Sequence, residues 1–176
     1  IRKLSEIIVS NGGSVFPDTQ VLSFVRDGKK LREAITTQGN FQFDQVVIAA
    51  GVYTSSILKR LDVCIPLQPA KGYSLSYEQK RTVVTRPLML DDARVVVTPL
   101  DKELRFSGLL DLGGFDEKLH RSRIKRIHRA INDFISIGSD ILLAEKRWCG
   151  LRPCTPDGLP IISRAEAIPN LVIATG

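Results

Sequence analysis

A proline-rich run near the C-terminus, residues 148–162, constrains the fold more than any other part of the chain. It reads WCGLRPCTPDGLPII and holds three of the nine prolines. Because proline fixes φ and has no N–H to donate, this run is neither a helix interior nor a central strand. Pro156, Asp157 and Gly158 are the residue types of a tight turn. We therefore predict a reversal of the chain between two apolar runs, residues 141–143 and 161–162.

One permanent cation, Arg152, stands in the middle of this run. The following residue, Pro153, favours an extended backbone at Arg152. A planar guanidinium matches both oxygens of a carboxylate, so Arg152 is a candidate receptor for a carboxylate ligand. The alternative is an ordinary ion pair at the surface. Asp157 is predicted to be a turn residue and not a base.

The composition is that of an ordinary globular protein. The chain has 176 residues, of which 43% are hydrophobic and 25% charged, enough for one domain or two small ones. No apolar run approaches the roughly 20 residues of a membrane span, and no signal peptide is visible. We expect a cytoplasmic protein, with peripheral contact with the inner face of the membrane left open. The start at Ile1 suggests a fragment or a processed chain.

The cysteines, histidines and charges exclude several classes of site. Three Cys and two His form neither a disulfide framework nor zinc-ligand spacing, so no metal is expected and a reducing compartment is indicated. The net charge of +6 would suit an anionic ligand, a membrane surface or nucleic acid. The basic residues on the helix predicted over 119–137 lack interleaved aromatic residues, so we expect a solvated face and no nucleic-acid binding.

The middle of the chain predicts an antiparallel sheet covered by one helix. Tyr73, Leu75 and Tyr77 alternate with polar residues, and further short strands are predicted at 95–97 and 104–106. Residues 66–72 are expected to be a hinge. The predicted helix ends at Gly138, and its apolar stripe consists of Ile124, Ile127, Ile131 and Phe134.

Two other stretches predict strands of a parallel sheet. Residues 46–50 form a continuous apolar run, which is typical of a strand buried on both faces. The run ends at Gly51 and leads into a helix predicted over 57–61. Residues 171–175 form a second such run, followed by Gly176. A strand that ends in glycine lets a ligand approach the backbone closely, so both ends are candidate ligand contacts.

The motif Gly150-Leu-Arg-Pro, followed by Thr155-Pro-Asp-Gly-x-Pro-Ile-Ile, resembles FAD-dependent D-amino-acid dehydrogenases. These are related to D-amino-acid oxidase, glycine oxidase and sarcosine oxidase. The resemblance implies an α+β or α/β fold, with part of a Rossmann-like FAD-binding domain and an antiparallel-sheet substrate domain under one helix. The implied segments are 1–66 for the FAD domain and 67–147 for the substrate domain. In residues 148–176 the chain would return to the FAD domain. The dinucleotide-binding GxGxxG is absent, and its place would lie upstream of Ile1.

The resemblance also implies the chemistry. The C–N bond of a D-amino acid would be oxidised to an imino acid and then a 2-oxo acid, with hydride transfer to flavin and reoxidation by a quinone-linked carrier or oxygen. Arg152 would hold the substrate carboxylate. The pocket residues would be Tyr73, Arg94, Val96, Trp148 and Leu151, and the FAD contacts Val21, Ala50, Gly51 and Gly176.

Two alternatives remain open from the sequence. An oxidase of glycine, sarcosine or a cyclic imino acid would share Arg152, although Val96 stands where glycine-oxidase-like relatives have Tyr. The other alternative is a non-catalytic domain that keeps the fold but has lost the GxGxxG loop, which binds the dinucleotide. By itself, this stretch of chain is expected to be inactive.

Overall fold

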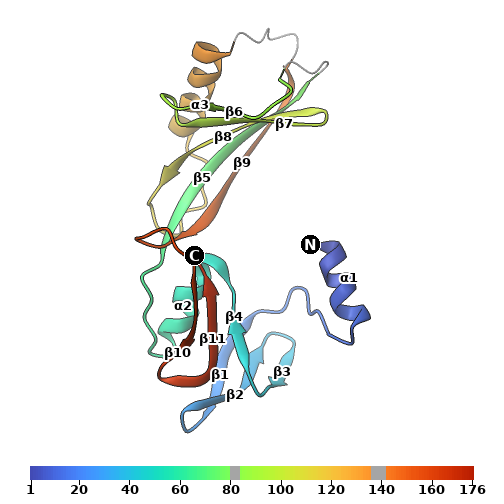
Figure 1. Ribbon diagram of the computed structural model, residues 1–176, viewed down its shortest axis with the longest axis vertical. Coiled ribbons are helices and arrows are strands. Elements are labelled where there is room, and N and C mark those ends of the chain that lie inside the picture. Colours follow the sequence, from blue (N-terminus) through green and yellow to red (C-terminus); the bar gives the residue numbers. More distant parts are fainter. Residues whose placement is uncertain (80–83, 136–141) are drawn as a thin grey trace. The chain divides into compact units, whose positions relative to one another are not determined.

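The computed structural model describes residues 1–79, 84–135 and 142–176 (Figure 1). The chain divides into two compact units. The first consists of Ile1–Ala49, Ser56–Cys64 and Ile161–Ala174, and the second of Ala50–Ser55, Ile65–Pro160 and Thr175–Gly176. The segments expected from the sequence differ from these units at residues 50–55, 65–66, 175–176 and, over the longest stretch, 148–160. Residues 148–160 belong to the second unit because residues 148–154 continue its sheet as a strand.

The first unit contains two small sheets. In one, β1, β2 and β3 are antiparallel neighbours; in the other, the order is β10-β11-β4. The strands are β1 Val21–Asp27, β2 Lys30–Thr36, β3 Gly39–Gln42, β4 Val46–Ile48, β10 Ile161–Ala165 and β11 Ile168–Thr175. The helix α2, Thr54–Lys59, follows a 3-10 turn, η1 Gly51–Tyr53, and begins earlier than the sequence predicted.

Both apolar runs form strands, and the parallel sheet expected for residues 46–50 is confirmed. β11 and β4 are parallel, with Leu171 opposite Val46 and Ile173 opposite Ile48. Leu171, Ile173 and Ile48 are buried, but Val47 is 60% exposed. The expectation that this strand is buried on both faces is therefore wrong for the described residues. β4 is an edge strand of a three-stranded sheet, and its second face is not covered.

The second unit is built on a five-stranded antiparallel sheet of order β6-β7-β8-β5-β9. One helix, α3 Arg121–Phe134, packs on one face of it, as the sequence predicted (Figure 1). The strands are β5 Gln68–Gln79, β6 Leu88–Leu90, β7 Val95–Leu100, β8 Glu103–Asp111 and β9 Leu142–Cys154. Most of the predicted hinge, from residue 68 onward, is strand β5, and one of the passages of the chain between the units lies at Cys64 and Ile65.

The core of the second unit lies between the sheet and α3. Tyr73, Leu75 and Tyr77 of β5 point into it, as their alternation predicted. The remaining core positions come from neighbouring strands and from α3: Val95, Val97, Leu104, Phe106, Ile124, Ile127, Ala130 and Ile131. Phe134, the last residue of α3, is 49% exposed and so departs from the predicted stripe. The predicted helix end at Gly138 lies outside the described residues.

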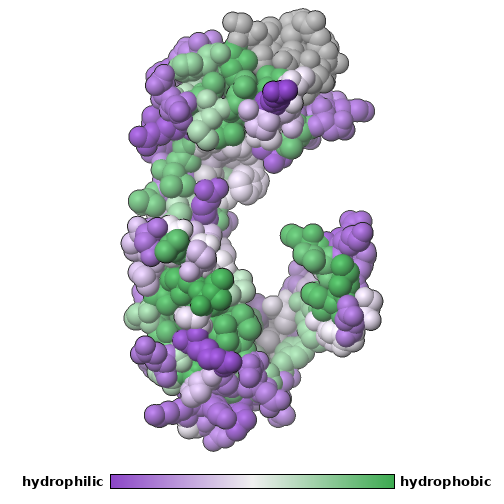
Figure 2. Space-filling view, viewed as in Figure 1, coloured by the Kyte–Doolittle hydropathy of each residue, from purple (hydrophilic) through white to green (hydrophobic). Residues whose placement is uncertain are grey.

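The N-terminal helix α1, Arg2–Ser10, is amphipathic, and none of its residues is buried. Figure 2 shows hydrophobic side chains at the surface of this helix. Leu4, Ile7 and Ile8 are among its exposed residues. α1 has 9 residues and α3 has 14. A bilayer span needs about 20 apolar residues, and no helix in the described ranges is long and apolar enough to cross one.

Candidate substrate and cofactor site

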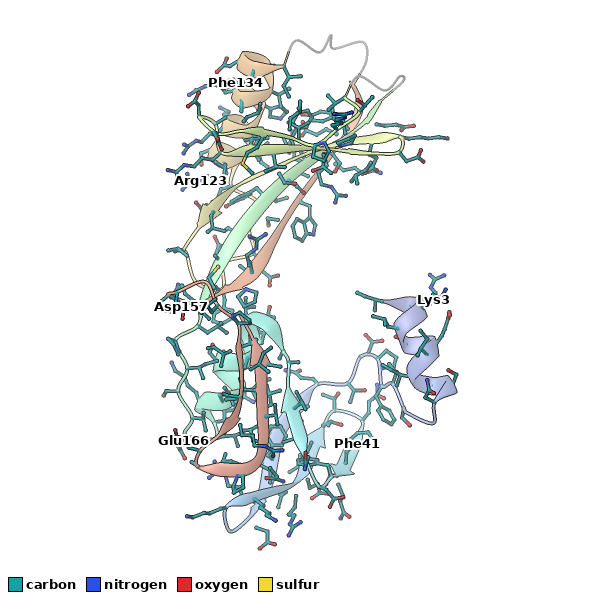
Figure 3. All side chains as sticks on the ribbon, viewed as in Figure 1. Lys3, Phe41, Arg123, Phe134, Asp157 and Glu166 are labelled. Carbon is teal, nitrogen blue, oxygen red and sulfur yellow. The ribbon has the colours of Figure 1, made fainter. Side chains whose placement is uncertain are left out.

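The proline-rich run forms the end of strand β9 and the turn that follows it. β9 is an edge strand, where Pro153 removes no ladder hydrogen bond that an inner strand would need. In the turn, Gly158 has φ 74° and its N–H donates to the Thr155 carbonyl over 3.3 Å. Asp157, labelled in Figure 3, accepts a hydrogen bond from the Leu159 N–H at 3.1 Å, which lowers the pKa of its carboxyl. The turn role predicted for Asp157 is confirmed.

Arg152 lies on the face of the sheet opposite α3. In the register of β5 and β9, Arg152 is opposite Ala70, Gly150 opposite Gly72, and Trp148 opposite Ser74. Because side chains alternate along a strand, these residues share one face, and Tyr73 belongs to the other, which packs on α3. We call the first the open face; its exposed side chains include Met89, Arg105, Leu110, Trp148 and Arg152.

The Arg152 side chain is exposed and pairs with no other residue in the described ranges, either by a hydrogen bond or by an ion pair. The neighbouring open-face positions Gly150 and Gly72 carry no side chains that could obstruct it. Its five donors are therefore available to a ligand. A guanidinium in this state can bind a carboxylate through two parallel hydrogen bonds.

Trp148 and Leu110 supply apolar surface beside Arg152. Trp148 is 62% exposed, and its indole lies over Gly150, where a β-carbon would overlap the ring. Leu110, which is 55% exposed, is opposite Gly72 on the neighbouring strand β8. Arg152, Trp148 and Leu110 thus surround a floor made of two glycines.

Sequence reasoning missed Leu110 because a β-bulge interrupts strand β8. Counting by two from the buried Leu104 and Phe106 would place Leu110 in the core. Leu109 is instead an extra residue with φ 61°, and the register shifts between Gly72 and Tyr73. The bulge turns Leu110 to the open face. No residue type in the run announces it, since a leucine is an unusual choice for positive φ.

The other predicted pocket residues lie apart from Arg152. Val96 is on the open face, but Ser107 and Ser74 lie between it and Trp148, a separation of roughly 14 Å across three strand spacings. Arg94 is exposed in the turn before β7, with φ 54°.

Tyr73 and Leu151 lie on the α3 face of the sheet. Tyr73 is 2% exposed, and its hydroxyl donates to Asp111 Oδ2 over 3.0 Å. Burial, followed by this hydrogen bond, raises the pKa of Tyr73. Leu151 is opposite Lys71 and therefore also faces away from Arg152. The structure brings Arg152 and Trp148 together and places these two predicted residues on the opposite face.

A buried cation, Lys71, anchors the loop between β8 and α3. Lys71 is 2% exposed, and its Nζ contacts Asp116 Oδ2 at 2.7 Å and donates to the Lys118 carbonyl over 3.0 Å. His120 Nε2 lies 2.6 Å from the same carboxylate oxygen. Burial opposes the charge on Lys71, but the hydrogen bond with Asp116 and the other interactions outweigh it and raise its pKa. The hydrogen bonds from Lys71, His120 and the Lys118 N–H hold the pKa of Asp116 far below its usual range.

The predicted cofactor residues Ala50, Gly51 and Gly176 come together at two strand ends. Parallel strands β4 and β11 both lead there, and ligands of parallel sheets bind at the carboxyl ends of the strands. The Thr175 hydroxyl donates to the Gly51 carbonyl over 3.0 Å, which joins the two ends. Gly51 has φ 55°, and a β-carbon there would meet no atom within 4 Å. The backbone at this edge is open to a ligand.

Val21 lies in a different place, within the first unit. It lines a cleft of about 380 Å³ between β1 and α2, together with Phe24, Ile57 and Arg60. Arg60 donates to the Leu22 carbonyl at 2.8 Å, so its guanidinium is partly engaged by the backbone of β1. The structure does not bring Val21 to Gly51 within one unit.

The strand ends fit contact with one part of FAD. Besides the open backbone at Gly51, the hydroxyl of Thr54 is buried without a hydrogen-bond partner in the described ranges. An unpaired buried hydroxyl costs about 1–3 kcal/mol, which a ligand or water atom would recover. β9, which carries Arg152, lies against η1 in the same unit. A group bound at Gly51 would therefore be held by the same unit that carries Arg152.

Comparison with known proteins gives one family for the whole chain. The family model described as "FAD dependent oxidoreductase" (DAO) matches residues 1–176. A D-amino acid dehydrogenase of Vibrio atlanticus is 37% identical over 161 residues, which cover 90% of this chain and 38% of that protein. D-amino acid dehydrogenase 1 of Mesorhizobium japonicum is 32% identical over 177 residues, covering 99% and 42%. The chain thus spans about two-fifths of these relatives.

The fold has relatives among solved structures as well. A glycine oxidase from Bacillus cereus superposes with a TM-score of 0.81 at 21% identity, over 99% of this chain and 48% of that one. At this identity the likeness shows the fold. Together with the strand ends open at Gly51 and the full-length family match, it leads to one conclusion: the chain belongs to the DAO family of FAD-dependent oxidoreductases.

Proposed function

We propose that this chain forms the substrate-binding part of an FAD-dependent D-amino acid dehydrogenase, in which Arg152 holds the carboxylate of the substrate. One observation carries the proposal: Arg152 is exposed on the open face with no partner in the described ranges. The relatives named D-amino acid dehydrogenase, at 32–37% identity, support the substrate class. A carboxylate is the group common to all such substrates.

The reaction converts the amino acid to an imino acid, which water hydrolyses to a 2-oxo acid and ammonia. FAD, when bound, supplies the acceptor for the two electrons. The residues of this chain bind and orient the substrate. Two parallel hydrogen bonds from Arg152 would fix both position and rotation of the carboxylate, which sets the direction of the Cα–H bond. The exposed apolar surfaces of Trp148 and Leu110 would exclude water from the same region.

The cofactor contacts belong to the proposal too. We assign Ala50, Gly51 and Gly176 to the edge that meets FAD, because Thr175 holds two of these strand ends together. Val21 is assigned to a separate contact through its backbone in the cleft beside α2. Val96 belongs to the outer part of the open face, and Arg94 lies in the turn before β7. Tyr73 and Leu151 are left out of the substrate site because they lie on the α3 face.

Steady-state kinetics of Arg152 variants in the complete flavoprotein test this proposal. Charge-assisted hydrogen bonds are worth about 1.5–3 kcal/mol, so Arg152→Ala should lower kcat/KM for D-alanine by roughly 10- to 150-fold. Most of the loss should appear in KM. Arg152→Lys should recover part of it, because a lysine keeps the charge but not the two-pronged geometry.

Arg105→Ala is the matched control. Arg105 is also exposed on the open face, but it lies opposite Ser76, six residues along β5 from Ala70, or about 20 Å from Arg152. Its Nε donates to Ser76 Oγ over 3.1 Å. The control should change kcat/KM by less than about twofold, within ordinary surface effects. Equal losses for Arg152→Ala and Arg105→Ala would remove Arg152 from the site.

A second candidate is an oxidase of glycine or a related small amine, supported by the fold likeness to glycine oxidase. The two functions differ in substrate and in electron acceptor. A dehydrogenase should reduce a quinone analogue with little oxygen consumption, and should prefer D-alanine or larger D-amino acids to glycine. Rapid oxygen uptake with glycine or sarcosine would favour the oxidase.

A further inference from the structure

We propose that Gly150 is a positioning residue, which lets the indole of Trp148 lie along β9 toward Arg152 and so form the wall that meets the substrate side chain. This inference rests on the proposed function. It assigns to Trp148 the recognition of apolar side chains and to Gly150 the orientation of the ring.

The first support is the direction in which the ring lies. Trp148, Gly150 and Arg152 occupy successive positions on one face of β9. The backbones of Trp148 and Arg152 are about 13 Å apart at strand spacing. The indole overlaps the space that a β-carbon of Gly150 would fill, so the ring occupies the interval between them. The ring therefore lies on the side of Trp148 that faces the proposed carboxylate anchor.

The second support is that the ring lies over Gly150 on one side and is accessible on the other. An aromatic side chain of this size gains stability when it is buried, yet Trp148 is 62% exposed. Its underside contacts the Gly150 backbone, which leaves the opposite side for a ligand. Leu110, across the sheet on β8, is likewise exposed and apolar. Surfaces of this kind bind apolar side chains, so the preferred substrates are D-amino acids with large apolar side chains, such as D-leucine.

The third support is that the atoms nearest to a side chain placed at Gly150 belong to the indole of Trp148. Gly150 is not among the residues with positive φ, so its backbone suits alanine. The three atoms nearest to a β-carbon at Gly150 are all carbons of the Trp148 ring. Gly72 is directly opposite on β5, and a β-carbon there would meet nothing within 4 Å. The two glycines therefore offer a matched test. An alanine at either position adds the same methyl group, but only the methyl group at Gly150 displaces the ring.

The test combines a spectroscopic and a kinetic readout on the complete flavoprotein. Trp148 is the only Trp of these 176 residues, and in protein labelled with 5-fluorotryptophan its ¹⁹F resonance is identified by its loss in Trp148→Phe. Gly150→Ala should shift this resonance, and Gly72→Ala should leave it unchanged. Gly150→Ala should also lower kcat/KM for D-leucine by about tenfold or more, and that for D-alanine by less, because the wall contacts the larger side chain.

A double-variant comparison separates ring displacement from a general effect of the added methyl. In a Trp148→Ala background no ring remains, so Gly150→Ala should cost less than about twofold for D-leucine. An unshifted resonance in Gly150→Ala, or the same tenfold loss in the Trp148→Ala background, would overturn the proposal. If Arg152→Ala has no effect while the resonance shifts as expected, the proposed carboxylate anchor fails and the ring placement stands.

Discussion

Thr175 and Gly51 join the ends of two parallel strands through a hydrogen bond of 3.0 Å from the threonine hydroxyl to the glycine carbonyl. The two residues are 124 positions apart in the chain. Thr175 is 9% exposed, so the bond is shielded from water. It fixes the edge at which Gly51 and Gly176 are proposed to meet FAD. The geometry of that edge therefore depends on a residue that need not touch the cofactor.

Thr175→Val should weaken FAD binding with little change in shape, because valine replaces the hydroxyl by a methyl group. The loss of one hydrogen bond, about 0.5–1.5 kcal/mol, corresponds to a dissociation constant roughly 2- to 12-fold higher. Titration of the complete apoprotein with FAD, followed by flavin fluorescence, measures this. Thr36→Val is the control, since Thr36 also donates to a glycine carbonyl, that of Gly39, but in the β2–β3 hairpin. Equal affinities for the wild type and Thr175→Val would contradict the proposed edge.

Asn170→Ala should destabilise the first unit strongly. Asn170 is 5% exposed; its Oδ1 accepts from the Leu31 N–H at 3.0 Å and its Nδ2 donates to the Leu31 carbonyl at 2.7 Å. Nδ2 also donates to the Asp44 carbonyl at 2.9 Å. Removal of the amide leaves buried backbone groups unpaired, at about 1–3 kcal/mol each.

Urea unfolding of the complete protein measures this loss as a change in the free energy of unfolding. We expect at least about 2 kcal/mol for Asn170→Ala. Asn40→Ala on the exposed strand β3 serves as the control and should stay within about 0.5 kcal/mol. A loss at Asn170 no larger than at Asn40 would show that the amide does not tie the two sheets together.

Asp116 should make stability depend on pH in the acid range only. Its pKa is lower in the folded protein than in the unfolded chain, where an aspartate titrates near 3.9. The stabilisation is therefore complete above that value and is lost as the pH falls toward the folded pKa. The difference in unfolding free energy between wild type and Asp116→Asn should be constant from pH 7 to 5 and should shrink below about pH 4.

This comparison is best made with His120→Gln in both proteins, since the imidazole of His120 contacts the same carboxylate and would otherwise add to the difference between the two proteins. Urea midpoints at pH 7, 5 and 3.5 suffice. A difference that is unchanged at pH 3.5 would mean that the Lys71–Asp116 pair does not stabilise the folded state.

The sequence predicted those parts of the fold that local patterns determine. The alternation at Tyr73, Leu75 and Tyr77 identified the buried face of β5, and the apolar run before Gly51 identified a parallel strand. The turn at Asp157 followed from its residue types. These features depend on neighbours within a few positions, and such neighbours are visible in a sequence.

The features that the sequence did not reveal depend on register and on distant contacts. The bulge at Leu109 reverses the face of Leu110, and the contact of Trp148 with Gly150 requires a particular ring orientation. Tyr73 was expected in the pocket from the family resemblance, but it lies on the face of β5 that packs on α3. Asn170 and Leu31 are 139 residues apart, and no local pattern links them. A prediction of the site therefore requires the strand register as well as the motif.

The most direct test of the proposed function is the visible absorption of the complete flavoprotein after anaerobic mixing with a D-amino acid. The flavin band should bleach with D-leucine or D-alanine and stay unchanged with the L-enantiomers, and Arg152→Ala should need a much higher substrate concentration for the same bleaching. A flavin band that no D-amino acid bleaches would contradict the assignment of this chain to D-amino acid oxidation.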